Sequence, residues 1–199
     1  MKQVLIETQL FKPSKGLLSE GKMSERGNPL VEGILATCEV ENGNGRYYSE
    51  DLWKREIDKY MELVDQNRAT GELDHPESQV INLKNVSHNI KDINWDGKNI
   101  MGTIEILPTP SGNILKALID SGITVGVSSR GMGSLEQKGE LMEVQDDFEL
   151  LCWDFVSTPS NPGSFMALRE GKENNINQYA KANSIVTEIL CANGNCPIF

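Results

Sequence analysis

Three segments carry residue types that can do acid–base or nucleophilic chemistry. Gly71–Pro76 reads GELDHP; the proline restricts the backbone before it and so holds the His75 ring in a defined direction. Gly126–Ser134 reads GVSSRGMGS; such small residues allow close backbone approach, and consecutive N–H groups can bind an oxyanion. Phe148–Val156 reads FELLCWDFV and buries Asp154 between apolar strand faces, so this carboxylate needs a donor partner.

Each segment also has an ordinary explanation when taken alone. His75 fits a surface histidine in a polar loop, the Gly/Ser segment fits a turn, and Asp154 fits a structural pair with an arginine or with backbone N–H groups. His88 alternates with polar residues in a predicted strand, which favours a structural role. The Gly/Ser segment is not a GxSxG nucleophile elbow, because Arg130 stands at the position of the second glycine.

Together the three segments supply a serine, a histidine and a buried acid. Serine is a poor nucleophile until an imidazole takes its proton, and a carboxylate must hold that imidazole in the right tautomer. The chain order His75, Ser128, Asp154 matches none of the three common orders of this triad. A less common fold is therefore predicted.

The elements that must position these residues are mostly strands. Hydrophobic alternation and turn signals predict strands over 3–8, 31–40, 86–90, 100–106, 124–128, 141–144 and 148–156, with a hairpin turn at Asp96-Gly97. Helical spacing predicts one helix starting at Ser49 and running to Val64, and a second, capped by Ser111, that ends at Gly122. The fold class is thus α+β, mainly β, without an alternating βαβ series.

Composition excludes several functions. The 199 residues carry a formal net charge of −10, which argues against nucleic-acid binding. No apolar run is long enough to span a membrane. The apolar stretch at the start of the sequence is too short for a secretory signal. Only two histidines and four cysteines without a CxxC pair are present, so no metal site is expected. No phosphate-binding glycine loop is present, so no nucleotide cofactor is expected.

The chain resembles the prohead (capsid-maturation) serine proteases of T-even-like tailed phages, relatives of herpesvirus assemblin. The resemblance rests on GELDHP at 71–76, GVSSRGMGSL at 126–135 and WDFVSTPSNP at 153–162, and it covers about residues 4–165. It implies a protease domain over 1–165, built as an antiparallel β-barrel with flanking helices. Residues 166–199 form a polar C-terminal tail whose apolar spacing allows an amphipathic helix.

The resemblance also assigns roles to residues. It implies His75 as general base, Ser128 as nucleophile and Asp154 as third member, where the assemblins use a second histidine. Ser129, Arg130 and Gly131 are implied to bind the oxyanion or the substrate. No cofactor and no metal are implied.

The function implied is cleavage of phage scaffold or core proteins and the major capsid protein, after Glu in Leu/Ile-x-Glu sequences. The place implied is the host cytoplasm, inside the immature head, with a homo-oligomer expected and no nucleic-acid or membrane partner. The alternative is a non-catalytic structural or scaffold component of the head or tube with a related barrel. The chain itself contains three such triplets, ending at Glu7, Glu20 and Glu32, and self-cleavage is expected at loop sites, Glu20 first.

Overall fold

The computed structural model describes residues 2–10, 23–74, 76, 78–139 and 141–157. The chain divides into two units, Met1–Pro162 and Gly163–Phe199, and every described residue lies in the first. The polar tail predicted over 166–199, with its amphipathic helix, lies outside the described residues. None of the helices in the described ranges is long and apolar enough to cross a membrane.

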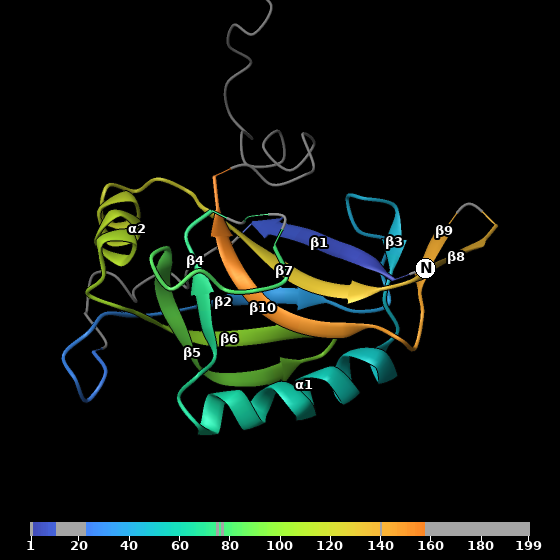
Figure 1. The fold of residues 1–199 in the computed structure, drawn as a ribbon, viewed down its shortest axis with the longest axis horizontal. Coiled ribbons are helices and arrows are strands. Elements are labelled where there is room, and N and C mark those ends of the chain that lie inside the picture. The colour runs from blue at the N-terminus through green and yellow to red at the C-terminus, as the bar shows by residue number, and fades with distance from the viewer. Residues whose placement is uncertain (1, 11–22, 75, 77, 140, 158–199) are drawn as a thin grey trace, which may run out of the picture. The chain divides into compact units, whose positions relative to one another are not determined.

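The strands of the described residues form three sheets (Figure 1). The first has the order β1-β7-β10, the second β2-β6-β5-β4, and the small third β3-β9-β8. The bounds are β1 Gln3–Leu10, β2 Leu30–Thr37, β3 Arg46–Tyr47, β4 Thr70–Glu72, β5 Val86–Asp96, β6 Asn99–Ile106, β7 Gly126–Gly133, β8 Leu135–Lys138, β9 Leu141–Val144 and β10 Glu149–Val156. The chain is mainly β, as predicted.

The predicted closed barrel is not present. β1 and β2 touch, but no hydrogen-bonded ladder joins them among the described residues, so both sheets stay open at that side. At the other side β4 approaches β10 through a single parallel bridge, Leu73 to Phe155. β4 is only three residues long and its register shifts between Gly71 and Glu72, so it does not extend the ladder. The prediction of a closed antiparallel barrel is wrong on this point.

β7 extends the strand predicted over 124–128 as far as Gly133, so the alternative that the Gly/Ser segment is a turn does not hold. It is the central strand of its sheet and pairs antiparallel with β1 on one side and β10 on the other. The two glycines at its far end, Gly131 and Gly133, are covered by the Phe148 ring; a Cβ on Gly131 would lie 2.4 Å from that ring. The glycines therefore leave room for an aromatic side chain instead of making a turn.

Two helices are present among the described residues, as expected. α1 (Glu50–Asp65) begins after Ser49, whose side chain accepts a hydrogen bond from the Leu52 N–H. α2 (Pro110–Asp120) is capped by Thr109 and not by Ser111 as predicted. Thr109 accepts from the Gly112 N–H while Pro110 occupies the first turn, where a missing N–H costs nothing.

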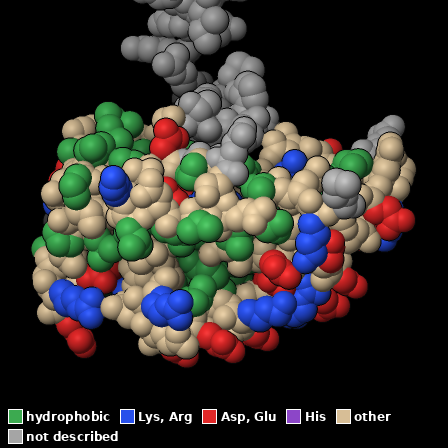
Figure 2. All heavy atoms as spheres, viewed as in Figure 1, with side chains coloured by type: hydrophobic (Ala, Val, Ile, Leu, Met, Phe, Trp, Pro, Cys, Tyr) green, Lys and Arg blue, Asp and Glu red, His purple; other side chains and the backbone are tan. Residues whose placement is uncertain are grey.

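The core lies between the sheets and α1, which contacts β5 of one sheet and β10 of another. Five aromatic rings pack at its centre: Tyr48, Trp53, Tyr60, Phe148 and Trp153. On the opposite, solvent side of α1, basic and acidic side chains alternate along the lower edge of Figure 2. Ion pairs such as Lys54–Glu50 lie on this face. The helix is thus amphipathic and joins the two larger sheets.

Candidate active site

Ser128 and Asp154 face each other across two paired strands. They are direct partners in the β7–β10 register, and both side chains are fully buried. Directly paired residues project their side chains to the same face of a sheet, with Cβ atoms about 5 Å apart. The predicted nucleophile and acid are therefore brought together, although they come from distant parts of the sequence.

Both side chains keep an oxygen without a hydrogen-bond partner. The Ser128 hydroxyl and Asp154 Oδ2 are buried and accept or donate no hydrogen bond among the described residues, although Arg130 Nε forms an ion pair with Asp154 Oδ2 at 3.0 Å. Buried polar groups are nearly always paired. Five other atoms of the described residues, among them the Trp53 and Trp153 indole nitrogens, also lack a hydrogen bond, so the missing bond alone assigns no role. An imidazole placed between a hydroxyl and a carboxylate would satisfy both.

His75 itself lies outside the described residues, but the chain on both sides of it is fixed. Before it, the Leu73 backbone bridges to Phe155, and the Asp74 N–H donates to the Phe155 carbonyl at 2.7 Å. After it, the Ser78 carbonyl accepts from Arg130 Nη1 at 2.7 Å. Asp74, which precedes His75, is therefore hydrogen-bonded to Phe155, which follows Asp154.

Arg130 occupies the centre of a buried charge cluster. Its guanidinium is 1 % exposed, and Nη2 lies 3.0 Å from Glu72 Oε1 and 3.2 Å from Asp154 Oδ1. Nε forms an ion pair with Asp154 Oδ2 at 3.0 Å. The Glu72 N–H also donates to Asp154 Oδ1 at 2.9 Å. Three strands, β4, β7 and β10, therefore meet at one carboxylate.

The electrostatics of the Asp154 carboxyl reflect this setting. Burial raises its pKa, and the Glu72 N–H and the Arg130 charge offset part of that rise. The neighbouring Cys152 thiol donates to Asp154 Oδ1 at 3.4 Å, and burial raises the pKa of that thiol far above its ordinary value. Cys152 is therefore a neutral thiol and a poor nucleophile.

The other predicted site residues lie around this pair in different ways. Ser129 pairs with Glu7 and Trp153, which places it on the opposite face of the sheet from Ser128. Gly131 packs under Phe148. The three nitrogens of Arg130 contact the carboxylates and the Ser78 carbonyl described above. The structure thus brings Arg130 to Asp154, and does not bring Ser129 to the Ser128 side chain.

Glu72 is the residue that the sequence analysis missed. It is fully buried, and it accepts from Arg130, from the Asn82 N–H at 3.0 Å and from Asn85 Nδ2 at 3.3 Å. A signal was present in the sequence, because Glu72 belongs to the same GELDHP segment as His75. A short acidic segment is ordinarily read as solvated, so its burial was not predicted.

His88 has the structural role expected for it. It is 1 % exposed, its Nδ1 lies 2.9 Å from the Ser87 hydroxyl, and its Nε2 lies 3.1 Å from the Trp153 carbonyl. Gly71 packs against this contact, because a Cβ there would lie 2.5 Å from the His88 ring and 1.9 Å from the Trp153 carbonyl oxygen. The His88 ring therefore connects β5 to β10 by a hydrogen bond. Because both ring nitrogens have partners, neither is available for catalysis.

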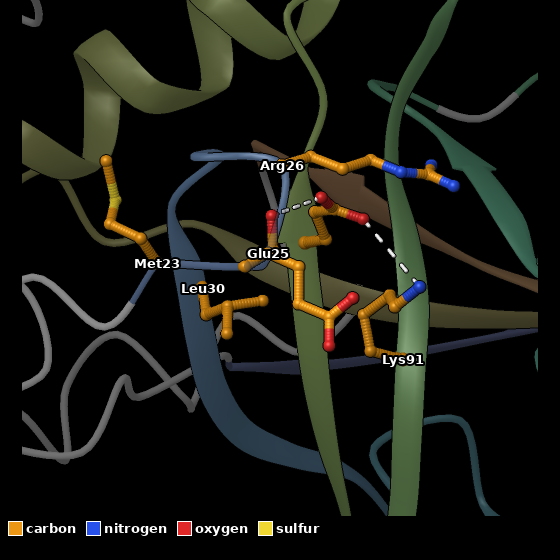
Figure 3. Close-up of a pocket in the computed structure, with 7 residues that line it drawn as sticks. Met23, Glu25, Arg26, Leu30 and Lys91 are labelled. Atoms are coloured by element: carbon orange, nitrogen blue, oxygen red, sulfur yellow. Dashed lines mark hydrogen bonds and ion pairs between the residues drawn. The ribbon is translucent and has the colours of Figure 1, made fainter.

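A separate pocket of about 470 Å³ opens between β2, β5, β6 and the segment before β2 (Figure 3). Glu105 lies inside it and accepts from the Ser24 hydroxyl at 2.6 Å, with Lys91 at 3.9 Å. Its lining contains none of the predicted site residues; it consists of Met23, Ser24, Glu25, Arg26, Leu30, Lys91 and Glu105. No group of three acidic, histidine or cysteine ligands occurs in the described part of the chain.

A comparison with known families identifies the family of this chain. The model of the prohead core protein serine protease family matches residues 7–176. The chain belongs to this family. It is therefore a prohead core protease homologue and a peptidase.

Two relatives place this prohead protease family member more closely. The prohead core protein protease of Enterobacteria phage T4 is 32 % identical over 145 residues, which cover 70 % of this chain and 68 % of that protein. A solved structure of the bacteriophage T4 capsid assembly protease has the same fold, with a TM-score of 0.71 and 28 % identity. The structural match covers 79 % of this chain and 99 % of the chain in the T4 structure.

Proposed function

We propose that this family member is a serine endopeptidase with Ser128 as nucleophile, His75 as general base and Asp154 as the acid that orients the imidazole. One observation carries the proposal: Ser128 and Asp154 are cross-strand partners, and neither the Ser128 hydroxyl nor Asp154 Oδ2 has a hydrogen bond among the described residues. The anchoring of Asp74 on Phe155 supports His75 as the group between them.

The reaction would follow the acyl-transfer sequence. The Ser128 hydroxyl attacks the substrate carbonyl carbon while His75 takes its proton, and the imidazolium then gives that proton to the leaving amine as the peptide C–N bond breaks. Water, activated by the same imidazole, releases the acyl group from the serine. Asp154 stabilises the imidazolium in both steps through its charge.

The oxyanion contacts predicted at Ser129, Arg130 and Gly131 stay a prediction. A single well-placed donor is worth about 3 kcal/mol to the tetrahedral intermediate. β7 has neighbours on both sides, so its backbone N–H groups point towards β1 and β10. A contribution from this segment would therefore need a local change in pairing when substrate binds.

The substrates proposed are the scaffold or core proteins and the major capsid protein of a phage, cut after Glu in Leu/Ile-x-Glu sequences inside the immature head. Support comes from the phage T4 relatives, which are a prohead core protease and a capsid assembly protease. The proposed site of action is the host cytoplasm during head assembly. A homo-oligomer is also proposed, because a protease that becomes active only on assembly would not digest the scaffold too early.

Self-cleavage is proposed at Glu20, which lies outside the described residues. The other two triplets lie in strands, because Glu7 belongs to β1 and Glu32 to β2. A peptide bond within a paired strand does not enter an active site unless the strand detaches. Terminal sequencing of aged protein should therefore find cleavage after Glu20 and none after Glu7 or Glu32; an intact 12–29 segment would contradict the proposal.

Covalent labelling by a fluorophosphonate probe tests the serine mechanism. Ser128 is fully buried, so the probe must be applied both to the isolated protein and to assembled heads. We expect labelling of the wild type, none of Ser128→Ala, and full labelling of Ser129→Ala as the matched control. Absence of labelling in both states would instead favour the alternative, a non-catalytic head component. Activity that survives a chelator would exclude a metal-dependent hydrolase.

A further inference from the structure

The buried cluster around Asp154 contains more charge than a catalytic triad needs. Asp154 and Glu72 are both fully buried, and one guanidinium, that of Arg130, lies between them. Two carboxylates against one cation leave a formal charge of −1. Such a surplus is costly inside a protein unless a further cation meets it.

The hydrogen bonds distribute that surplus unevenly. Glu72 is well satisfied, because Arg130, the Asn82 N–H and the Asn85 amide all donate to it. On Asp154, all the hydrogen bonds from described residues reach Oδ1, while Oδ2 has only the Arg130 ion pair and no hydrogen bond. Beside its ion pair with Arg130, Asp154 Oδ2 can therefore still accept a hydrogen bond, on the face of the sheet that Ser128 shares.

The same guanidinium also holds the chain that carries the base. Arg130 Nη1 binds the Ser78 carbonyl at 2.7 Å, while the Leu73 and Asp74 backbones bind Phe155 on the other side of His75. Glu72 lies three residues before His75, and its backbone N–H reaches Asp154. Glu72 and Arg130 therefore connect the acid to the segment of the base.

We propose that Glu72 and Arg130 are positioning residues for the triad, an inference that rests on the function proposed above. Arg130 fixes the Asp154 carboxylate and the chain at Ser78, and it does not reach the substrate. Glu72 holds Arg130 in place and keeps the cluster negative, so that the imidazolium formed during acyl transfer meets a net charge of −1. This assigns Arg130 a role other than the oxyanion contact predicted for it.

The pH dependence of labelling can isolate this effect, because the other titratable groups facing the cluster are silent near neutral pH. Burial raises the pKa of the Cys152 thiol and of the Tyr60 phenol far above their ordinary values. Burial lowers the pKa of His88 to about 4. Among the described residues close to His75 in the chain, the other charged side chain is that of Asp74, which is exposed.

The test measures the rate of fluorophosphonate labelling against pH in Glu72→Gln, in the state in which the wild type labels. Glutamine keeps the shape and one acceptor but removes the charge. We expect a rate at least about tenfold lower at low probe concentration. The acid limb should move to lower pH by about one unit, because the loss of negative charge disfavours the imidazolium and so lowers the pKa of His75. Arg130→Lys keeps the positive charge but loses the planar guanidinium that contacts both carboxylates at once. It should slow labelling, while the midpoint of the acid limb stays within a few tenths of a pH unit of that of the wild type.

Glu56→Gln is the matched control. Glu56 is also a buried carboxylate, and it accepts from a β10 backbone N–H, that of Leu150, at 3.0 Å, but it lies on α1 among Arg55 and Lys59. Its neutralisation should change stability without moving the acid limb.

A Glu72→Gln protein that is folded by circular dichroism and labels with the wild-type rate and acid limb would overturn the inference. The proposed function fails separately, if Ser128→Ala labels like the wild type.

Discussion

At the scale of single residues, His88 is buried and contacts the carbonyl of Trp153, the residue before Asp154. Its ring packs edge-on against Phe155 with centroids 4.8 Å apart, and burial lowers its pKa from 6.5 to about 4. The histidine that looked competitive with His75 in the sequence is thereby withdrawn from proton transfer near neutral pH. Its structural role makes a prediction about acid stability.

The folded protein binds this proton less readily than the unfolded chain. Stability from neutral His88 is complete above the unfolded pKa of 6.5 and falls as pH decreases from 6.5 towards about 4. Between pH 7 and 5 the loss should be about 2 kcal/mol from this group. Urea unfolding of wild type and His88→Gln at the two pH values checks this. The variant should be less stable at pH 7 but should lose less on acidification; an equal loss in both proteins would contradict the assignment.

At the scale of elements, α1 connects the two larger sheets and depends on how it begins. Ser49 is extended and accepts from the Leu52 N–H at 3.2 Å, with Glu50 and Asp51 in the first turn where the helix dipole favours acids. The buried face of the helix includes Trp53 and Tyr60, which pack on Trp153 of β10. The start of α1 therefore helps to set the position of the side chains that pack on β10, the strand that carries Asp154.

Ser49→Ala should lower the free energy of unfolding by about 1 kcal/mol, because one orphan N–H of the first turn loses its acceptor. Urea unfolding followed by circular dichroism measures the change. Ser49→Asp keeps an acceptor and should retain most of the stability. Equal losses in the two variants would mean that the cap hydrogen bond is not the source.

At the scale of the whole molecule, aromatic contacts link the helix α1 to strands of the described unit. Phe148 packs edge-on against Tyr48 and Trp53, at 5.4 and 5.9 Å between ring centroids, and also covers the glycines of β7. Its ring therefore touches α1, the segment before it and the strand that carries Ser128. Removing it should weaken all of these at once.

Phe148→Ala should cost about 3–5 kcal/mol, since a buried ring is replaced by a cavity. Chemical unfolding followed by tryptophan fluorescence and by circular dichroism should give coincident transitions shifted to lower denaturant. Leu83→Ala serves as the control, because Leu83 is 80 % exposed and its truncation should change stability by less than about 0.5 kcal/mol. Two separate transitions in Phe148→Ala would show that the sheets unfold independently.

Periodicity was sufficient for most of the elements that carry these groups. The helix after Ser49 and the strands around Asp154 and Ile100 follow from apolar spacing, because that spacing records which face is buried. The length of β7 was underestimated, because a glycine-rich sequence ordinarily indicates a turn. The Phe148 ring that packs on Gly131 and Gly133 explains why the strand continues there. β4 was missed because three residues are too few to show a period.

By itself the sequence determined which residues are chemically able to act and that the chain is mainly β, since residue type and apolar period are local properties. Only the tertiary structure decided that the sheets stay open, that Ser128 faces Asp154, and that Arg130 is held between Glu72 and Asp154. These features depend on strand register and on burial of charge between elements far apart in the chain. No local pattern encodes them, because a carboxylate that looks solvated in sequence becomes buried only when three strands meet around it.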